Sequence, residues 1–142
     1  MSDMNNYLEE ELGDYLLRGQ ALSVPTNLYV ALCSGVPNDS HTGTNLPELV
    51  GGNGYERKPI VRTTNEWSNS TQITESGTFH NITAVAWTAS ANFGWISGIA
   101  ITDNLGTGSG NIWFQKALTT PKEIGNGDTF TLASGAIVVR FG

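Results

Sequence analysis

The stretch TDNLGTGSGNIWFQ, Thr102 to Gln115, decides the fold, because its closely spaced glycines could either hold a phosphate or turn a hairpin. Phosphate-binding glycine loops follow a buried strand and open a helix, whose N-terminal amide groups point at the anion. Here the residues on both sides, Trp95 to Ile101 and Ile112 to Leu118, are rich in β-branched and aromatic types, which are typical of strands. The glycines therefore predict a hairpin between two strands and argue against a nucleotide site.

Further from this hairpin, alternating apolar and polar residues predict about eight short strands at intervals of roughly ten residues. Asn27 to Cys33 is apolar on both faces, which predicts a central strand, whereas Pro59 places the strand over Tyr55 to Arg62 at an edge. The other expected strands are two weak ones within Glu66 to Ile82, and Ala84 to Ala89, Trp95 to Ile101, Ile112 to Leu118, Thr129 to Leu132 and Ala136 to Phe141. We expect an all-β fold, an antiparallel β-sandwich in the form of a jelly roll, with one N-terminal α-helix.

The strand at Trp95 to Ile101 has a regular alternation. It predicts one face with Ile99 and Ile101, and an opposite face with Ile96, Gly98 and Ala100. Three of the four tryptophans fall within predicted strands, where aromatic residues usually fill the core. These are Trp87, Trp95 and Trp113.

The N-terminal segment has a helical period. Leu8, Leu12, Tyr15 and Leu16 recur at spacings of four, three and one, and so form one apolar stripe of a helix expected from about Asn5 to Arg18. An asparagine suits the start of such a helix, and the glycine at position 19 suits its end. We expect the stripe to pack on its own domain, with packing on a neighbouring subunit as the alternative.

Length and composition set the class of protein. The 142 residues fit one compact domain, with an N-terminal amphipathic helix over residues 1–19 and a β-sandwich domain over residues 20–142. The formal charge of −6 argues against a nucleic-acid partner, because phosphate binding relies on clustered Lys and Arg. No run approaches the ~18 apolar residues that span a bilayer, so we expect no membrane partner. The one cysteine, Cys33, cannot form a disulfide within these residues or a cysteine-built zinc site.

A long segment from Ser34 to Gly54 is rich in glycine, proline and short polar residues. Such a long connection is uncommon in a compact domain and tends to be functional. We therefore expect it to contact a partner. Its candidate contact residues are His41, Leu46 and Leu49.

Residues that could carry chemistry are scattered. His41 and His80 have no activated serine or cysteine in a recognisable motif, and the acids of Glu9 to Glu11 are typical of a solvated helix face. A calcium site built from Asp103, Asn104 and Asp128 is a less favoured alternative to turn-capping carboxylates. The polar neighbours of Trp67 predict an exposed ring, which could contact another subunit or stack on a sugar. We predict no catalytic, cofactor-binding or metal-ligating residue and no cofactor.

Five segments occur in a set order and cover nearly the whole chain. They are YLEEELGDYLLRG (Tyr7 to Gly19), PTNLYVALCSGVP (Pro25 to Pro37), GGNGYERKPI (Gly51 to Ile60), WTASANFGWISGIAI (Trp87 to Ile101) and ALTTPKEIGNGDTFTLASGAIVV (Ala117 to Val139). Together they resemble a family of small virion proteins of tailed bacteriophages. Members are often labelled tail fibre proteins and are similar to capsid decoration, or cement, proteins.

The resemblance implies a non-enzymatic virion structural protein of a tailed double-stranded DNA bacteriophage, made in the host cytoplasm. The first expectation is a capsid decoration protein that binds the major capsid protein on the outer capsid surface as a homotrimer and stabilises the shell. A tail fibre or baseplate component, or a carbohydrate-binding jelly-roll module for host attachment, is the alternative. The candidate subunit or capsid contacts are Leu8, Leu12, Tyr15, Leu16, His41, Leu46, Leu49 and Trp67.

Overall fold

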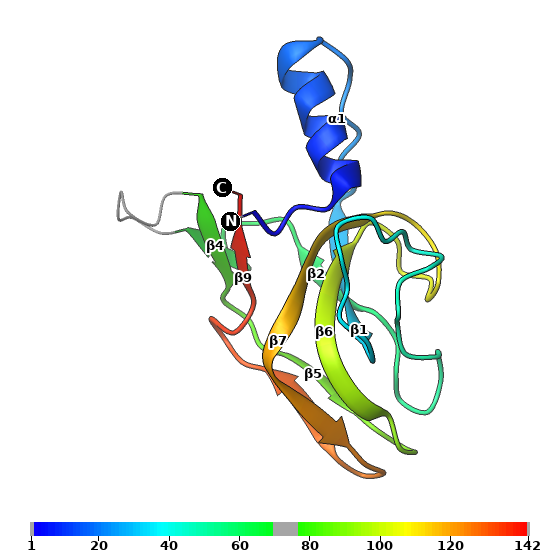
Figure 1. The fold of residues 1–142 in the computed structure, drawn as a ribbon. Helices are drawn as coiled ribbons and strands as arrows, with labels where there is room; N and C mark the ends of the chain where they lie inside the picture. Colours follow the sequence, from blue (N-terminus) through cyan, green and yellow to red (C-terminus); the bar gives the residue numbers. More distant parts are fainter. Residues whose placement is uncertain (1, 70–76, 142) are drawn as a thin grey trace.

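The computed structural model of the chain describes residues 2–69 and 77–141 (Figure 1). Within these residues there is one helix, and it is too short and too polar to cross a bilayer. The elements are α1 (Asn6–Leu17), β1 (Asn27–Cys33), β2 (Lys58–Val61), β3 (Trp67–Asn69), β4 (Thr78–Asn81), β5 (Val85–Thr88), β6 (Gly94–Thr102), β7 (Ile112–Ile124), β8 (Thr129–Leu132) and β9 (Val138–Arg140). The expected all-β class with one N-terminal helix is confirmed. The predicted strand region between Glu66 and Ile82 lies partly outside the described residues.

The strands form three antiparallel sheets. A four-stranded sheet has the order β2-β1-β6-β7, a three-stranded sheet the order β3-β4-β9, and a two-stranded sheet pairs β5 with β8. In Figure 1 the four-stranded sheet is strongly curved, and β4 and β9 lie beyond β7. This division differs from the two larger sheets expected of a jelly roll. Strand spacing along the chain indicates how many strands form, but the partner of each strand depends on long connections that spacing does not describe.

β1 is the central strand that its two apolar faces predict. One face supplies Leu28, Val30 and Leu32 to the main core, which the curved sheet shares with the smaller sheets and the base of α1. The other face supplies Ala31 and Cys33 to a second, smaller cluster. The remaining members of that cluster are Leu46, Ala100 and Ile112. Pro59 of β2 lies in an edge strand and is exposed, as expected.

The long segment from Ser34 to Gly54 covers the second face of the curved sheet. Leu46 packs there, and the Gly43 N–H donates to the carbonyl of Gly110 at 3.1 Å. A Cβ atom on Gly43 would lie 2.1 Å from the Ser109 carbonyl oxygen, so only glycine allows this close approach. The glycine content of the segment therefore has a structural cause at this position.

The alternation predicted for β6 is wrong at one residue. The register with β7 shifts between Ile96 and Gly98, as at a β-bulge. As a result Ile96 belongs to the same core cluster as Ile99 and Ile101, and Ala100 belongs to the cluster on the other face.

β7 is longer than the sequence predicts, because it continues past Leu118 to Ile124. Its pairing with β6 breaks after Ala117 and resumes at Lys122. Pro121 lies in this interval, where it has no partner in the ladder, so its missing N–H costs no sheet hydrogen bond.

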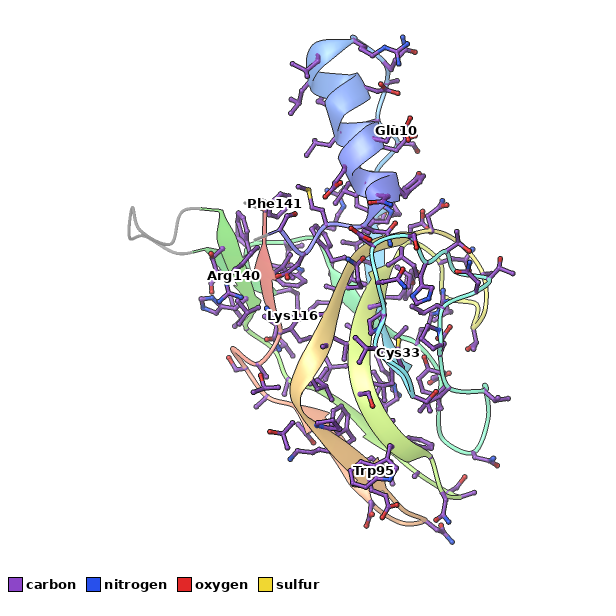
Figure 2. All side chains as sticks on the ribbon, in the orientation of Figure 1. Glu10, Cys33, Trp95, Lys116, Arg140 and Phe141 are labelled. Carbon is purple, nitrogen blue, oxygen red and sulfur yellow. The ribbon has the colours of Figure 1, made fainter. Side chains whose placement is uncertain are left out.

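The tryptophans do not all lie in the core. Trp87 and Trp113 are buried as expected, and the Trp87 indole N–H donates to the Glu56 carbonyl at 2.7 Å. Trp95 is 56% exposed at the end of the molecule far from α1 (Figure 2), so its expected burial is wrong. It is the second residue of β6 and pairs with Glu123 near the end of β7.

The Cys33 thiol gives a pH-dependent prediction. Burial, with a smaller contribution from the Glu48 carboxylate, raises its pKa from 9.0 to about 12. The folded state then keeps a proton that the unfolded chain loses above its own pKa, so this stabilisation is complete below pH 9.0 and disappears as the pH rises towards 12. We expect the free energy of unfolding to fall above pH 9.0 by up to about 1.4 kcal/mol per pH unit through this group.

Denaturant titrations at several alkaline pH values, with the Cys33→Ala variant as control, measure this effect. The variant should show a shallower fall than the native sequence, and equal slopes would contradict the assignment. The native thiol should also resist iodoacetamide until denaturant is added, because its sulfur is fully buried.

Candidate functional site

Residues 6–26, which we call the helical arm, project from the body of the protein (Figure 1). Asn5 caps α1, because its Oδ1 accepts a hydrogen bond from the Tyr7 N–H at 3.0 Å. Gly19 follows the C-cap of α1 and has a φ of 69°, a conformation that glycine adopts readily. The predicted helix is confirmed to within one residue at each end, and the segment after Gly19 runs back beside it to β1.

Asn5 also fixes the direction of the arm. It is almost fully buried, and its Nδ2 donates to the His41 carbonyl at 3.0 Å and to Gln115 Oε1 at 3.1 Å. Its backbone N–H donates to the Trp113 carbonyl at 2.9 Å. One asparagine thus joins the helix, the long segment and β7.

The apolar stripe of α1 begins in the core and continues beyond the edge of the domain. Leu8 is buried in the main core and Leu12 is half-buried, whereas Tyr15 is 51% exposed and Leu16 is 66% exposed. Packing on the same domain therefore holds only for the first part of the stripe. For Tyr15 and Leu16 the expected packing on the same domain is wrong, because they are exposed and the helix projects away from the body (Figure 1).

A groove of about 560 Å³, which we call the aromatic groove, opens between the curved sheet and the three-stranded sheet. Its lining residues are Leu28, Arg62, Thr63, Thr64, Trp67, Phe79, Phe114, Val139 and Phe141. The ring of Phe141 makes edge contacts with Phe79 and Phe114, with centroid distances of 5.5 and 5.3 Å. Phe141 lies near the base of α1 (Figure 2), so the groove and the arm occupy the same end of the molecule.

The groove has a mainly apolar surface. Leu28, Phe114 and Val139 are buried, and Trp67 and Phe79 are partly buried beside them. The polar side chains in the lining come from Arg62 and the two threonines that follow it. Such a lining favours an apolar occupant with an acidic margin over a ligand that needs many hydrogen bonds.

A buried ion pair holds the loops on the other side of the curved sheet. The fully buried Arg57 donates from Nε to Glu48 Oε2 at 2.9 Å and from Nη2 to Glu48 Oε1 at 2.8 Å. Its Nη1 donates to the carbonyls of Asn104 and Ser109, both at 2.8 Å. The pair therefore links the long segment to the hairpin between β6 and β7.

The glycine-rich hairpin between β6 and β7 directs a backbone N–H group at the Glu48 carboxylate. The Gly108 N–H donates to Glu48 Oε1 at 3.1 Å, so the hairpin binds a carboxylate of its own chain. The Tyr55 hydroxyl donates to the other carboxylate oxygen. Burial first, and then the charge of Glu48, raises the pKa of Tyr55, which keeps this donor protonated. The predicted hairpin between two strands is confirmed.

The histidines have local structural roles. His41 Nδ1 accepts from the Asn38 N–H at 2.9 Å, and His80 Nε2 bonds to the Ser68 hydroxyl across β3 and β4. Within residues 2–69 and 77–141, no carboxylate hydrogen-bonds to His80. Among these residues, the pair therefore has no third group that would orient a base towards a serine nucleophile.

The calcium alternative is wrong. Asp103 follows β6 and accepts from the Asn111 N–H at 2.8 Å, whereas Asp128 lies in the turn after β7 and accepts from the Gly125 N–H at 2.7 Å. Since β6 and β7 are antiparallel, these positions are at opposite ends of the pair. In the part of the chain that the structure describes, no three acidic, His or Cys side chains lie close enough together to hold a metal ion.

The eight predicted contact residues are distributed over three places. Leu46 and Leu49 are buried residues of the long segment, and Leu8 is buried at the base of the arm, so none of the three presents a surface in this conformation. His41 is half-buried beside the N-cap of α1. The residues with accessible side chains are Leu12, Tyr15 and Leu16 on the arm and Trp67 in the aromatic groove.

Most residues of the aromatic groove could not be predicted from the sequence. Phe79, Phe114 and Phe141 belong to three different strand regions, and only the pairing of β4 with β9 and the packing of β7 bring their rings together. The available signal was an aromatic residue within or beside each of three strands. That signal does not reveal a shared face without the strand order.

One family of known proteins matches residues 3–140, and its description is podophage GP4 fiber I protein gp80. The chain belongs to this gp80 family. The match covers almost all of the chain, and it identifies a structural protein of the phage virion. Among curated proteins, none matches the chain. The resemblance to small virion proteins of tailed phages is confirmed.

The ion pair predicts a large stability effect in this gp80 family member. Arg57→Met leaves the nearly buried Glu48 carboxylate without its cation, so we expect a loss of roughly 3–5 kcal/mol in the free energy of unfolding. The double variant Glu48→Gln with Arg57→Met should lose much less than the sum of the single changes. Arg18→Met is the control, because its exposed pair with Asp14 should contribute at most about 1 kcal/mol. Additive losses in urea titrations would contradict the coupling.

The anchor at the base of the arm predicts a second effect. Asn5→Asp keeps a capping oxygen but places a carboxylate against the His41 carbonyl and Gln115 Oε1. We expect Asn5→Asp to lower the free energy of unfolding by about 2 kcal/mol or more, a loss comparable to that of Asn5→Ala. The reason is that the buried carboxylate oxygen then faces two other acceptors, the His41 carbonyl and Gln115 Oε1. If capping were the only role of Asn5, Asn5→Asp would be nearly neutral in thermal and urea denaturation.

Proposed function

We propose that this protein is a non-enzymatic subunit of the phage tail fibre and works through contacts between its surface and neighbouring subunits. The family match over residues 3–140 carries the proposal, because the family description names a fibre protein. A fibre subunit needs a rigid body and a surface that binds other subunits. It needs no reactive centre.

The structure supplies features that suit this role. The Arg57–Glu48 pair and the Asn5 anchor hold the long segment, the hairpin and the arm in one arrangement. The arm then presents an apolar stripe, and the aromatic groove presents an apolar recess. Stable protein contacts are commonly built from aromatic and aliphatic anchors seated in such recesses.

Capsid decoration remains a prediction from the resemblance. It would place the protein on the outer capsid surface as a homotrimer bound to the major capsid protein, and it differs from the fibre role in location. We rank the fibre role first, since the family description names that structure. A glycan-binding role would use Trp67, but the groove offers few polar side chains for sugar hydroxyl groups.

Purified virions test the proposal. Isotope-labelled peptide standards measure the copy number relative to the major capsid protein, and antibodies against the chain locate it by electron microscopy. We expect a small fraction of the capsid protein copy number and label on the tail. A copy number approaching that of the capsid protein, with label over the head, would support decoration. Absence from virions would contradict both roles.

A further inference from the structure

Two apolar features at one end of the molecule have no partner among the described residues. The first is the outer part of the α1 stripe, formed by Leu12, Tyr15 and Leu16. The second is the aromatic groove, where the rings of Phe79 and Phe141 line a recess of about 560 Å³. Water-exposed apolar surface of this kind on a soluble protein marks an interaction site.

The α1 stripe does not line the groove of its own chain, although the arm meets the groove margin where Arg62 Nε donates to the Pro25 carbonyl at 2.6 Å. Asn5 holds the start of α1 against the long segment and β7, and the helix then points away from the body (Figure 1). Leu16 lies eight residues beyond the buried Leu8, which places it roughly 12 Å further along the helix axis. The outer stripe is therefore available for contact with another molecule.

We propose that the α1 stripe of one copy of this chain binds in the aromatic groove of a second copy. An amphipathic helix placed in an apolar groove, with anchors at spacings of three and four, is a recurrent mode of protein recognition. The groove volume of about 560 Å³ lies within the range of roughly 300–1,000 Å³ typical of clefts that enclose a ligand. The chain itself thus provides both a groove and an occupant with suitable apolar anchors.

Charge complementarity supports a second copy as the partner. α1 contains Glu9, Glu10, Glu11 and Asp14 and no basic residue. In contrast, the groove lining contains Arg62, whose Nε donates to the Pro25 carbonyl at 2.6 Å. At 3.6 residues per turn, Glu9 and Glu11 flank the apolar stripe, and Glu10 lies on the opposite side of the helix. The stripe can therefore enter the groove with an acidic side chain directed at Arg62. A net charge of −6 would disfavour most other contacts between copies.

This contact is head to tail, because each copy gives a helix and receives a helix. Such contacts close into rings or extend into filaments, depending on the rotation between copies. Both outcomes suit a fibre or a trimeric virion subunit, so the inference deepens the proposed structural role and rests on it for its setting in the virion.

Two adjacent leucines provide a matched pair of variants. Leu16 belongs to the stripe, while Leu17 lies outside it and is 87% exposed. In the full purified chain, Leu16→Glu should raise the dissociation constant between copies at least tenfold in analytical ultracentrifugation, and Leu17→Glu should leave it unchanged. Both side chains are exposed, so thermal melts should show that both variants fold. Equal effects of the two substitutions would overturn the proposal.

Charge exchange tests the groove side. Arg62→Glu should weaken self-association, and adding Glu9→Lys and Glu11→Lys to it should restore part of the affinity. Glu10→Lys in the same background is the control and should restore less. A restoration equal to that of the flanking pair would contradict the proposed orientation of the helix.

Mixing variants tests the head-to-tail geometry. Chains with Leu16→Glu keep an intact groove. Chains with Arg62→Glu keep the α1 stripe and lose the hydrogen bond from Arg62 to the Pro25 carbonyl. An equimolar mixture should therefore form dimers that neither variant forms alone. A native chain that stays monomeric at micromolar concentrations would overturn the proposal while leaving the virion location untouched. A groove that instead binds glycans, seen as quenching of tryptophan fluorescence that Trp67→Ala abolishes, with self-association unaffected by Leu16→Glu, would also overturn it.

Discussion

The pairing of Arg57 with Glu48 is the interaction on which the loop side of the molecule depends. Removing two charges from water is costly, and the cost is met here because the guanidinium donates to the carboxylate and to two backbone carbonyls. The carboxylate also accepts from Tyr55 and from the Gly108 amide. Since these partners come from three separate segments, only one arrangement of the loops satisfies all of them.

The effect of this pair extends to the arm. It holds the long segment over the second face of the curved sheet, where Leu46 completes a small apolar cluster. The same segment carries the His41 carbonyl, which accepts from Asn5 at the start of α1. A chain of fixed contacts therefore runs from the buried charges to the direction of the helix. The apolar stripe projects as it does because the base of the arm is held on two sides.

In this protein the reactive groups and the interior ion pair described above are buried, whereas the apolar side chains of the arm and the groove are exposed or partly exposed. Its thiol, its phenol at position 55 and its interior ion pair are enclosed, and the pKa values of Cys33 and Tyr55 are raised, which keeps both groups neutral. The arm and the aromatic groove, in contrast, face outward. This division suits the role proposed for this member of a phage fibre family, in which its surface binds other subunits.

Local patterns were sufficient for the elements of this fold and for part of the site. The helix, its glycine stop, the central strand at Asn27–Cys33, the edge strand with Pro59 and the glycine hairpin all follow from periods and backbone preferences that act within a few residues. The polar neighbours of Trp67 predicted an exposed ring, whereas the ring is partly buried against the core in the lining of the groove. Local patterns did not predict three other features: the bulge that moves Ile96, the exposure of Trp95 and the division into three sheets. These features depend on which strands pair.

The sequence by itself determined that the chain forms short antiparallel strands after an amphipathic helix, since hydrophobic period and turn chemistry are local properties. Only the tertiary structure decided that this helix leaves the body, that Arg57 and Glu48 meet in the interior, and that three phenylalanines from distant strands share one groove. The physical reason is that a residue's burial depends on the long-range partner of its strand, and no local pattern encodes that partner.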